Sequence, residues 1–196
     1  MYGIMKDGVL IGQFDAPLTL RSNQPVFGGD SLSLKRTTRK RAAQRWEIKA
    51  NIEPLIGNAN ELFALLVTNG SSVPYTVMCP QNYGVLLARK YVMPVTVSGS
   101  PKSSTITLSN NVNTIPVGTM IQFENHTKVY MVNSLPDADR NVKIFPPLVH
   151  SVINETLRWR EDVMMLAYMD LDQIAGMVYT DGIVMDIGTV NMVEKL

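Results

Sequence analysis

The chain is poor in the residues that carry most chemistry. It has one cysteine, Cys79, among 196 residues, so no disulfide can form within the chain and no oxidising compartment is implied. Charged side chains make up 18% of the sequence, below the roughly 25% usual for soluble domains, which indicates that partners cover part of the surface. No run approaches 18 apolar residues, and no basic and apolar secretion signal opens the sequence, so we expect neither a spanning helix nor export.

These scarcities also argue against catalysis. His126 and His150 are the only histidines, and with an isolated Cys79 they form no ligand set of zinc-like spacing. Neither histidine stands recognisably beside a serine or aspartate that would make a nucleophilic pair. No glycine-rich stretch has the pattern of a phosphate-binding loop, and no acidic stretch has that of a calcium loop. We therefore expect no enzyme, no metal and no cofactor.

Short strands dominate what is present. Residues 44–52 alternate, with Trp46, Ile48, Ala50 and Ile52 on one side, which predicts a half-buried strand. One helix is predicted over residues 58–69. Its start resembles a capping box, and Asn69-Gly70 supplies a left-handed stop. Many short strands with turn signals and a single helix predict a mainly β protein of the sandwich or barrel type.

Three other segments support specific expectations. Residues 1–14 read as a hairpin, and residues 15–31 read as a loop because they hold two prolines and two adjacent glycines. The run at 163–169 is continuously apolar, as expected for a strand covered on both faces.

The predicted domain organisation is a body with an insertion. Residues 115–148 read as a compact β-module, in which strands are separated by tight turns and closed by a double proline. We therefore predict one β-sandwich or barrel body, formed by residues 1–90 and 152–196. A small inserted β-barrel at 91–151 would interrupt it.

Positive charge is concentrated in one segment. Six of the 18 basic residues lie there, which leaves 12 basic and 17 acidic residues elsewhere, and no acid occurs between residues 31 and 46. The six are Lys35, Arg36, Arg39, Lys40, Arg41 and Arg45. Such a cluster can neutralise phosphates of nucleic acid. A contact with an acidic neighbouring subunit and a plain solvated loop explain it equally well, since no aromatic residues are interleaved to stack bases.

Two parts of the sequence resemble small β-rich tail proteins of tailed bacteriophages. In residues 44–80 the similarity lies in QRWEI, NELFALL and the following glycine and proline. In residues 115–150 it lies in VGTMI at 117–121, KVYMV at 128–132 and IFPPL at 144–148. The resemblance covers about 70 residues and is one of pattern, not of a strict motif. It points to the tail-tube, distal-tail and baseplate-hub group.

The resemblance implies a structural role. Such proteins have a β-sandwich body with a flanking helix and assemble into hexameric rings around a DNA channel. We accordingly expect a non-enzymatic component of the virion tail, whose partners are further copies of itself and neighbouring tube or baseplate proteins. DNA would be cargo in the channel, and no membrane is involved. The basic segment becomes a candidate subunit contact, and the apolar strand residues Met164, Met165 and Met169 become candidates for the ring seam. The alternative is a head–tail connector that contacts nucleic acid through residues 35–45.

Overall fold

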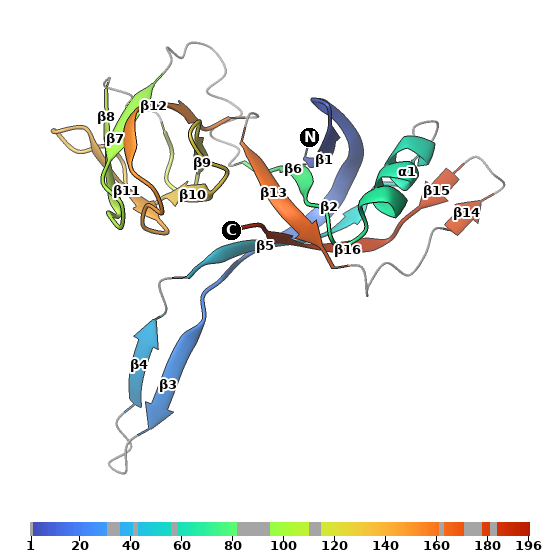
Figure 1. The fold of residues 1–196 in the computed structure, drawn as a ribbon, viewed down its shortest axis with the longest axis horizontal. Coiled ribbons are helices and arrows are strands. Elements are labelled where there is room, and N and C mark those ends of the chain that lie inside the picture. Colours follow the sequence, from blue (N-terminus) through green and yellow to red (C-terminus); the bar gives the residue numbers. More distant parts are fainter. Residues whose placement is uncertain are drawn as a thin grey trace.

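The chain is mainly β, with two closed six-stranded barrels placed side by side and one short helix (Figure 1). The computed structural model describes residues 2–30, 36–40, 43–55, 59–81, 95–109, 115–160, 163–170, 178–180 and 184–196. Across these residues, no helix is both long enough and apolar enough to cross a membrane. The mainly β class predicted from the short strands is confirmed, and the sandwich-or-barrel choice resolves to barrels.

The first barrel is built from antiparallel strands in the order β1, β2, β5, β16, β13, β6, with β6 closing onto β1. The strand bounds are β1 Gly3–Lys6, β2 Val9–Asn23, β5 Arg45–Ile52, β6 Tyr75–Met78, β13 Met164–Met169 and β16 Thr189–Glu194. The hairpin predicted over residues 1–14 is confirmed, because β1 and β2 pair across a turn in which Asp7 and Gly8 have positive φ. The alternation in β5 also holds, since its four apolar residues face the core.

The helix α1, Ala59–Asn69, covers one opening of the first barrel. Leu62 and Leu66 are buried in the barrel core. A side-chain carbon added at Gly12 would lie 2.9 Å from Leu62, so glycine in β2 allows the helix to approach this closely. The predicted stop is confirmed: Gly70 has a φ of 55°, and its N–H donates to the carbonyl of Leu66. The predicted cap, Asn58, lies outside the described residues.

The second barrel has the strand order β10, β11, β8, β7, β12, β9 and is also closed. The strand bounds are β7 Thr96–Gly99, β8 Thr105–Leu108, β9 Met120–Phe123, β10 Val129–Val132, β11 Asn141–Phe145 and β12 Val152–Arg158. The predicted boundary at residue 152 is wrong, because β12 pairs with β7 and β9 of this barrel and not with the first. The other predicted boundary, at 90/91, lies outside the described residues.

Two ribbons project from the first barrel. The ribbons consist of β3 Val26–Asp30 with β4 Arg36–Lys40, and of β14 Val178–Thr180 with β15 Val184–Asp186. The loop predicted over residues 15–31 is therefore wrong. Strand β2 continues to Asn23. Its ladder with β5 has an irregularity between Asp15 and Thr19, so Pro17, which cannot donate a backbone hydrogen bond, is not part of the pairing and does not end the strand.

The C-terminal strands differ from the sequence expectation in a second way. Strand β13 alternates between fully and partly buried residues, so it is not covered equally on both faces as its apolar run suggested. Strand β16, which the sequence patterns did not reveal, completes the barrel wall between β5 and β13. The inward residues of both strands, Met165, Met169 and Met192 among them, belong to the core of the first barrel.

Candidate functional site

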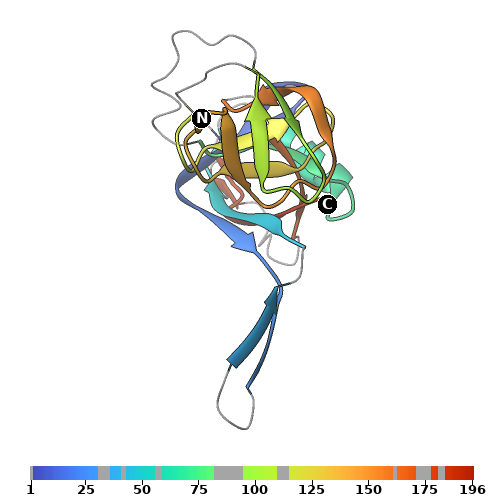
Figure 2. The same ribbon diagram turned by 90° about the vertical axis from the view of Figure 1, so that its left-hand side faces the viewer.

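The β3–β4 ribbon is a free-standing extension of the barrel wall, called the arm below (Figures 1 and 2). Strands β2 and β5 lead out of the barrel into it, and five residue pairs from Val26↔Lys40 to Asp30↔Arg36 form its ladder. Within the described residues, β3 and β4 pair only with each other. Both outer edges of the arm therefore present unpaired backbone groups, which is the usual template for strand addition.

The structure places the predicted basic residues along the arm and at its root. Arg36, Arg39 and Lys40 lie in β4, and Arg36 is exposed. Arg45 begins β5, where its guanidinium lies 3.9 Å from the carboxylate of Glu47 with half of its side chain exposed. Lys35 and Arg41 lie outside the described residues. The cluster is thus carried on an extended ribbon, whereas the sequence suggested a loop.

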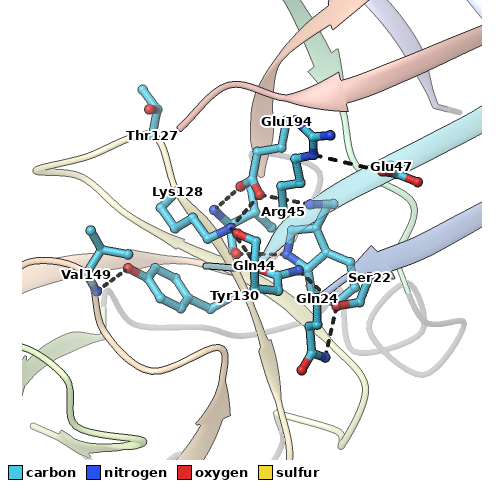
Figure 3. A network of polar contacts seen from close by, with 12 residues as sticks. Ser22, Gln24, Gln44, Arg45, Glu47, Thr127, Lys128, Tyr130, Val149 and Glu194 are labelled. Atoms are coloured by element: carbon cyan, nitrogen blue, oxygen red, sulfur yellow. Dashed lines mark hydrogen bonds and ion pairs between the residues drawn. The ribbon is translucent and has the colours of Figure 1, made fainter. Parts of the chain in front are cut away.

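The arm root is tied to the second barrel through a buried lysine (Figure 3). The ammonium of Lys128 donates to Glu194 Oε2 at 2.5 Å, to Gln44 Oε1 at 2.8 Å and to the Gln44 carbonyl at 2.9 Å. All three of its donors are therefore satisfied. Lys128 is 6% exposed and Glu194 is fully buried. Gln44 in turn donates to Ser22 at the end of β2, so the two strands that lead to the arm are joined at this point.

Glu194 completes the cluster with backbone partners. Its carboxylate accepts the N–H of Trp46 through Oε2 and the N–H of Val129 through Oε1, each at 3.0 Å. The Trp46 indole donates to the Val129 carbonyl at 2.9 Å, and its ring meets Phe145 edge-on. Burial lowers the pKa of Lys128, while the Glu194 carboxylate raises it. The cluster holds charges in fixed positions at the boundary of the two barrels and presents no reactive group to a ligand.

Two glutamines add further inter-barrel bonds. Gln122 of β9 donates to the Met164 carbonyl at 2.7 Å and accepts the Met164 N–H at 3.2 Å. Gln81 does the same for Met120 of β9, at 3.0 and 3.1 Å. Each glutamine amide thus makes the two backbone hydrogen bonds, one donated and one accepted, that a neighbouring strand would otherwise make with the methionine. Because both barrels are closed, these amide pairs and the Lys128 cluster take the place of a shared sheet.

The two histidines, far apart in the sequence, meet at the edge of the second barrel. Their rings are 5.4 Å apart, and His126 Nε2 lies 2.8 Å from Tyr130 Oη. His126 Nδ1 faces Asn125 Oδ1, which can only accept, so Nδ1 carries the proton and Nε2 accepts from the tyrosine. Tyr130 Oη also accepts the N–H of Val149 at 3.2 Å. The chain of bonds ties the 124–127 turn to the segment after β11.

The electrostatics favour this neutral arrangement. Burial and the neighbouring His150 lower the pKa of His126 to about 4, and burial raises the pKa of Tyr130 to about 12. A shallow pocket of about 320 Å³ beside the turn includes Glu124 and Arg158, whose side chains pair at 3.4 Å. Among the described residues, the polar partners of the His126 ring are Tyr130 and Asn125, and neither is an acid.

The methionine seam predicted from the sequence is wrong in part. Met165 and Met169 are 0% and 1% exposed, and they point into the first barrel, where a partner cannot contact them. Met164 is half-buried, and its backbone is bonded to Gln122 of the second barrel. Cys79 belongs to the same core, and burial raises its pKa to about 12. Within the described residues, no group of three or more histidine, cysteine or acidic side chains is arranged to hold a metal.

The sequence contains one signal for the buried cluster of Lys128, Glu194 and Gln44, and it lies in β16. Val190, Met192 and Glu194 alternate in β16 and all face inward, so the acid continues an apolar pattern at a position where a buried partner is required. Nothing local pointed to Lys128 as that partner, because the two lie 66 residues apart. No protein-family model matches the chain, and no curated protein matches it.

Proposed function

We propose that this chain is a non-enzymatic structural subunit of a bacteriophage tail, at the tube–baseplate junction or in the distal tail. Copies would join into a ring, with six the expected number, around the channel through which DNA passes. The resemblance of residues 44–80 and 115–150 to tail proteins is one support. The first stretch contains β5, α1 and β6 of the first barrel, and the second contains β9, β10 and β11 of the second barrel.

The observation that carries the proposal is the arm. A two-stranded hairpin is at best marginally stable in water by itself. This one extends from a closed barrel with unpaired edges and a basic strand. A partner surface would complete its hydrogen bonds and neutralise its charge. A head-to-tail contact in a ring joins two different surfaces of neighbouring copies, and a projecting arm can supply one of them.

The test is assembly with and without the arm. In the shortened variant, an Asn-Gly turn replaces residues 25–43, so that Gln24 and Gln44 close a two-residue hairpin loop in the register of Asn23↔Arg45. Circular dichroism would verify its fold. We expect rings of the full chain in negative-stain electron microscopy at high protein concentration and only single subunits of the shortened variant. Rings that form equally well without the arm would contradict the role assigned to it. Single subunits of the full chain, even with a tail-tube protein added, would contradict the proposal.

The second candidate is a connector that contacts nucleic acid, and the shape of the arm favours it. A two-stranded β-ribbon fits the major groove of DNA, and basic residues on it can contact phosphates. If all six basic residues engaged, the logarithm of the duplex affinity would fall with the logarithm of salt with a slope of about −5. Replacing Arg36, Arg39, Lys40 and Arg41 by glutamine should then abolish binding. A salt slope near zero would exclude this candidate.

A further inference from the structure

Two free-standing two-stranded sheets occur in the described part of the chain. Both barrels are closed, so each of their strands has a neighbouring strand on either side, although β2 beyond Gln13 is paired with β5 alone. The remaining strands form the arm and the β14–β15 ribbon, each of which is a two-stranded sheet. Among the described residues, these two ribbons are therefore the sheets whose outer edges are free along their whole length for a partner strand.

The two ribbons carry opposite charge. The sequence from 35 to 45 holds six basic residues and no acid, whereas the sequence of the second ribbon, from 178 to 186, holds two aspartates and no lysine or arginine. Of these aspartates, Asp186 ends β15 and is exposed. Its carboxylate accepts the Gly188 N–H at 2.8 Å, which leaves further acceptor sites directed to solvent.

The ribbons stand at opposite ends of the barrel wall. Strand β16, which follows β15, starts at Thr189 opposite Asn51, near the end of β5. The arm joins the other end of β5, at Arg45. Strand β5, which separates the two ribbons, has eight residues and spans about 25 Å, at roughly 3.3 Å per residue. Figure 1 shows the arm pointing away from β14–β15, so the two ribbons of one copy do not meet.

A groove on this wall, formed by β2, β5 and β16, does not fit the arm. It measures about 490 Å³ and is lined by Arg21, Arg45 and Lys49 against Glu47 and Asp170. With more cations than acids, this surface repels a basic segment. The acidic ribbon is the better electrostatic match.

We propose that the β3–β4 arm of one copy binds the β14–β15 ribbon of the next copy, by strand addition with charge pairing around Asp186. The contact is head-to-tail, since each copy offers both surfaces at separated places. This inference rests on the proposed ring and names the two faces that would form it. Strand addition supplies the hydrogen bonds, and the opposite charges select the partner and its orientation.

Cross-linking between two single-cysteine variants tests the contact. Arg36→Cys and Asp186→Cys are mixed and treated with a short bismaleimide, and the buried Cys79 serves as the unreactive background. We expect a cross-linked dimer that requires both variants. The control pair is Arg36→Cys with Asp139→Cys, which places an exposed acidic position of the second barrel in the same assay. Val178→Cys, on the exposed part of β14, repeats the test without disturbing the Asp186 bond.

Charge changes provide the second readout. Asp186→Asn keeps an acceptor for the Gly188 N–H but removes the charge, so we expect about two- to fivefold weaker association of copies, as for an exposed ion pair. Asp139→Asn should have no effect. Cross-linking no greater than in the control pair overturns the contact, and if rings still form, the proposed function survives. Cross-linked open chains without rings support the contact and contradict the ring.

Discussion

Breaking the Lys128–Glu194 pair should destabilise the folded chain far more than breaking a surface ion pair. Replacing Lys128 by methionine keeps the volume of the side chain but leaves a fully buried carboxylate with only two backbone donors. Gln44 simultaneously loses the donor to its carbonyl and to its side-chain oxygen. Breaking a buried pair in this way costs about 3–5 kcal/mol, because the remaining charge stays desolvated. We expect a loss of that size in the free energy of unfolding.

The loss in the free energy of unfolding can be measured by urea denaturation, followed by tryptophan fluorescence. Trp46 is bonded to both Glu194 and Val129 at the cluster, whereas Trp159 lies in the core of the second barrel. The Lys128→Met midpoint should fall, and separate transitions of the two tryptophans would show that the barrels no longer unfold together.

Two further variants make the reasoning refutable. Lys143→Met removes an exposed lysine of the same barrel and should stay within about 0.5 kcal/mol of the natural chain. Adding Glu194→Gln to Lys128→Met removes the orphaned charge and should recover about 1–3 kcal/mol, as contacting residues do in double-mutant cycles. If Lys128→Met costs less than about 1 kcal/mol, the cluster is not the buried, desolvated pair argued above.

Three other outcomes follow from the described contacts. His126 has a pKa of about 4 when folded against an ordinary 6.5, so the unfolded chain binds more protons between these values. Stability should be full above pH 6.5 and fall by about 1–3 kcal/mol towards pH 4, and His126→Gln should flatten this dependence in denaturation at several pH values. Cys79, with its pKa near 12, should resist a thiol reagent in the native state and react only on unfolding; fast labelling at neutral pH would contradict its burial. Gly3→Ala would place a carbon 2.0 Å from the Gly12 carbonyl oxygen, so its thermal midpoint should fall by several degrees, whereas Gly29→Ala, with open space around it, should match the natural chain.

The parts of the fold that the sequence predicted are those set by local rules. The alternation at Trp46, Ile48, Ala50 and Ile52 fixes the inward face of β5, and the glycine after Asn69 fixes the end of α1. The same rules failed at residues 15–31, because two prolines and two glycines are the composition of a loop. An exposed ribbon tolerates glycine, and a bulge tolerates proline, so composition cannot distinguish the arm from a loop.

Contacts between distant segments were beyond those rules. No periodic pattern in the sequence indicates that β12 pairs with the second barrel or that His126 and His150 are in contact. In the methionine-rich run at 163–169, the sequence predicted an intermolecular contact where the structure has a core. Its hydrophobicity fits a core as well as an interface, and only the register of β13 between β6 and β16 decides that Met165 and Met169 face inward.

The position of the buried ion pair bears on how an assembly could be built. Replacing a buried ion pair by well-packed apolar side chains of the same volume is often neutral or stabilising, so the presence of this pair at the boundary calls for a reason other than stability. Apolar surfaces of two closed barrels could pack at several angles, but Lys128 satisfies its three donors only where Glu194 and Gln44 coincide. The same Gln44 joins the strands that lead to the arm. The cluster therefore fixes the second barrel and the direction of the arm together, which a subunit that must reach a neighbour at a defined angle requires.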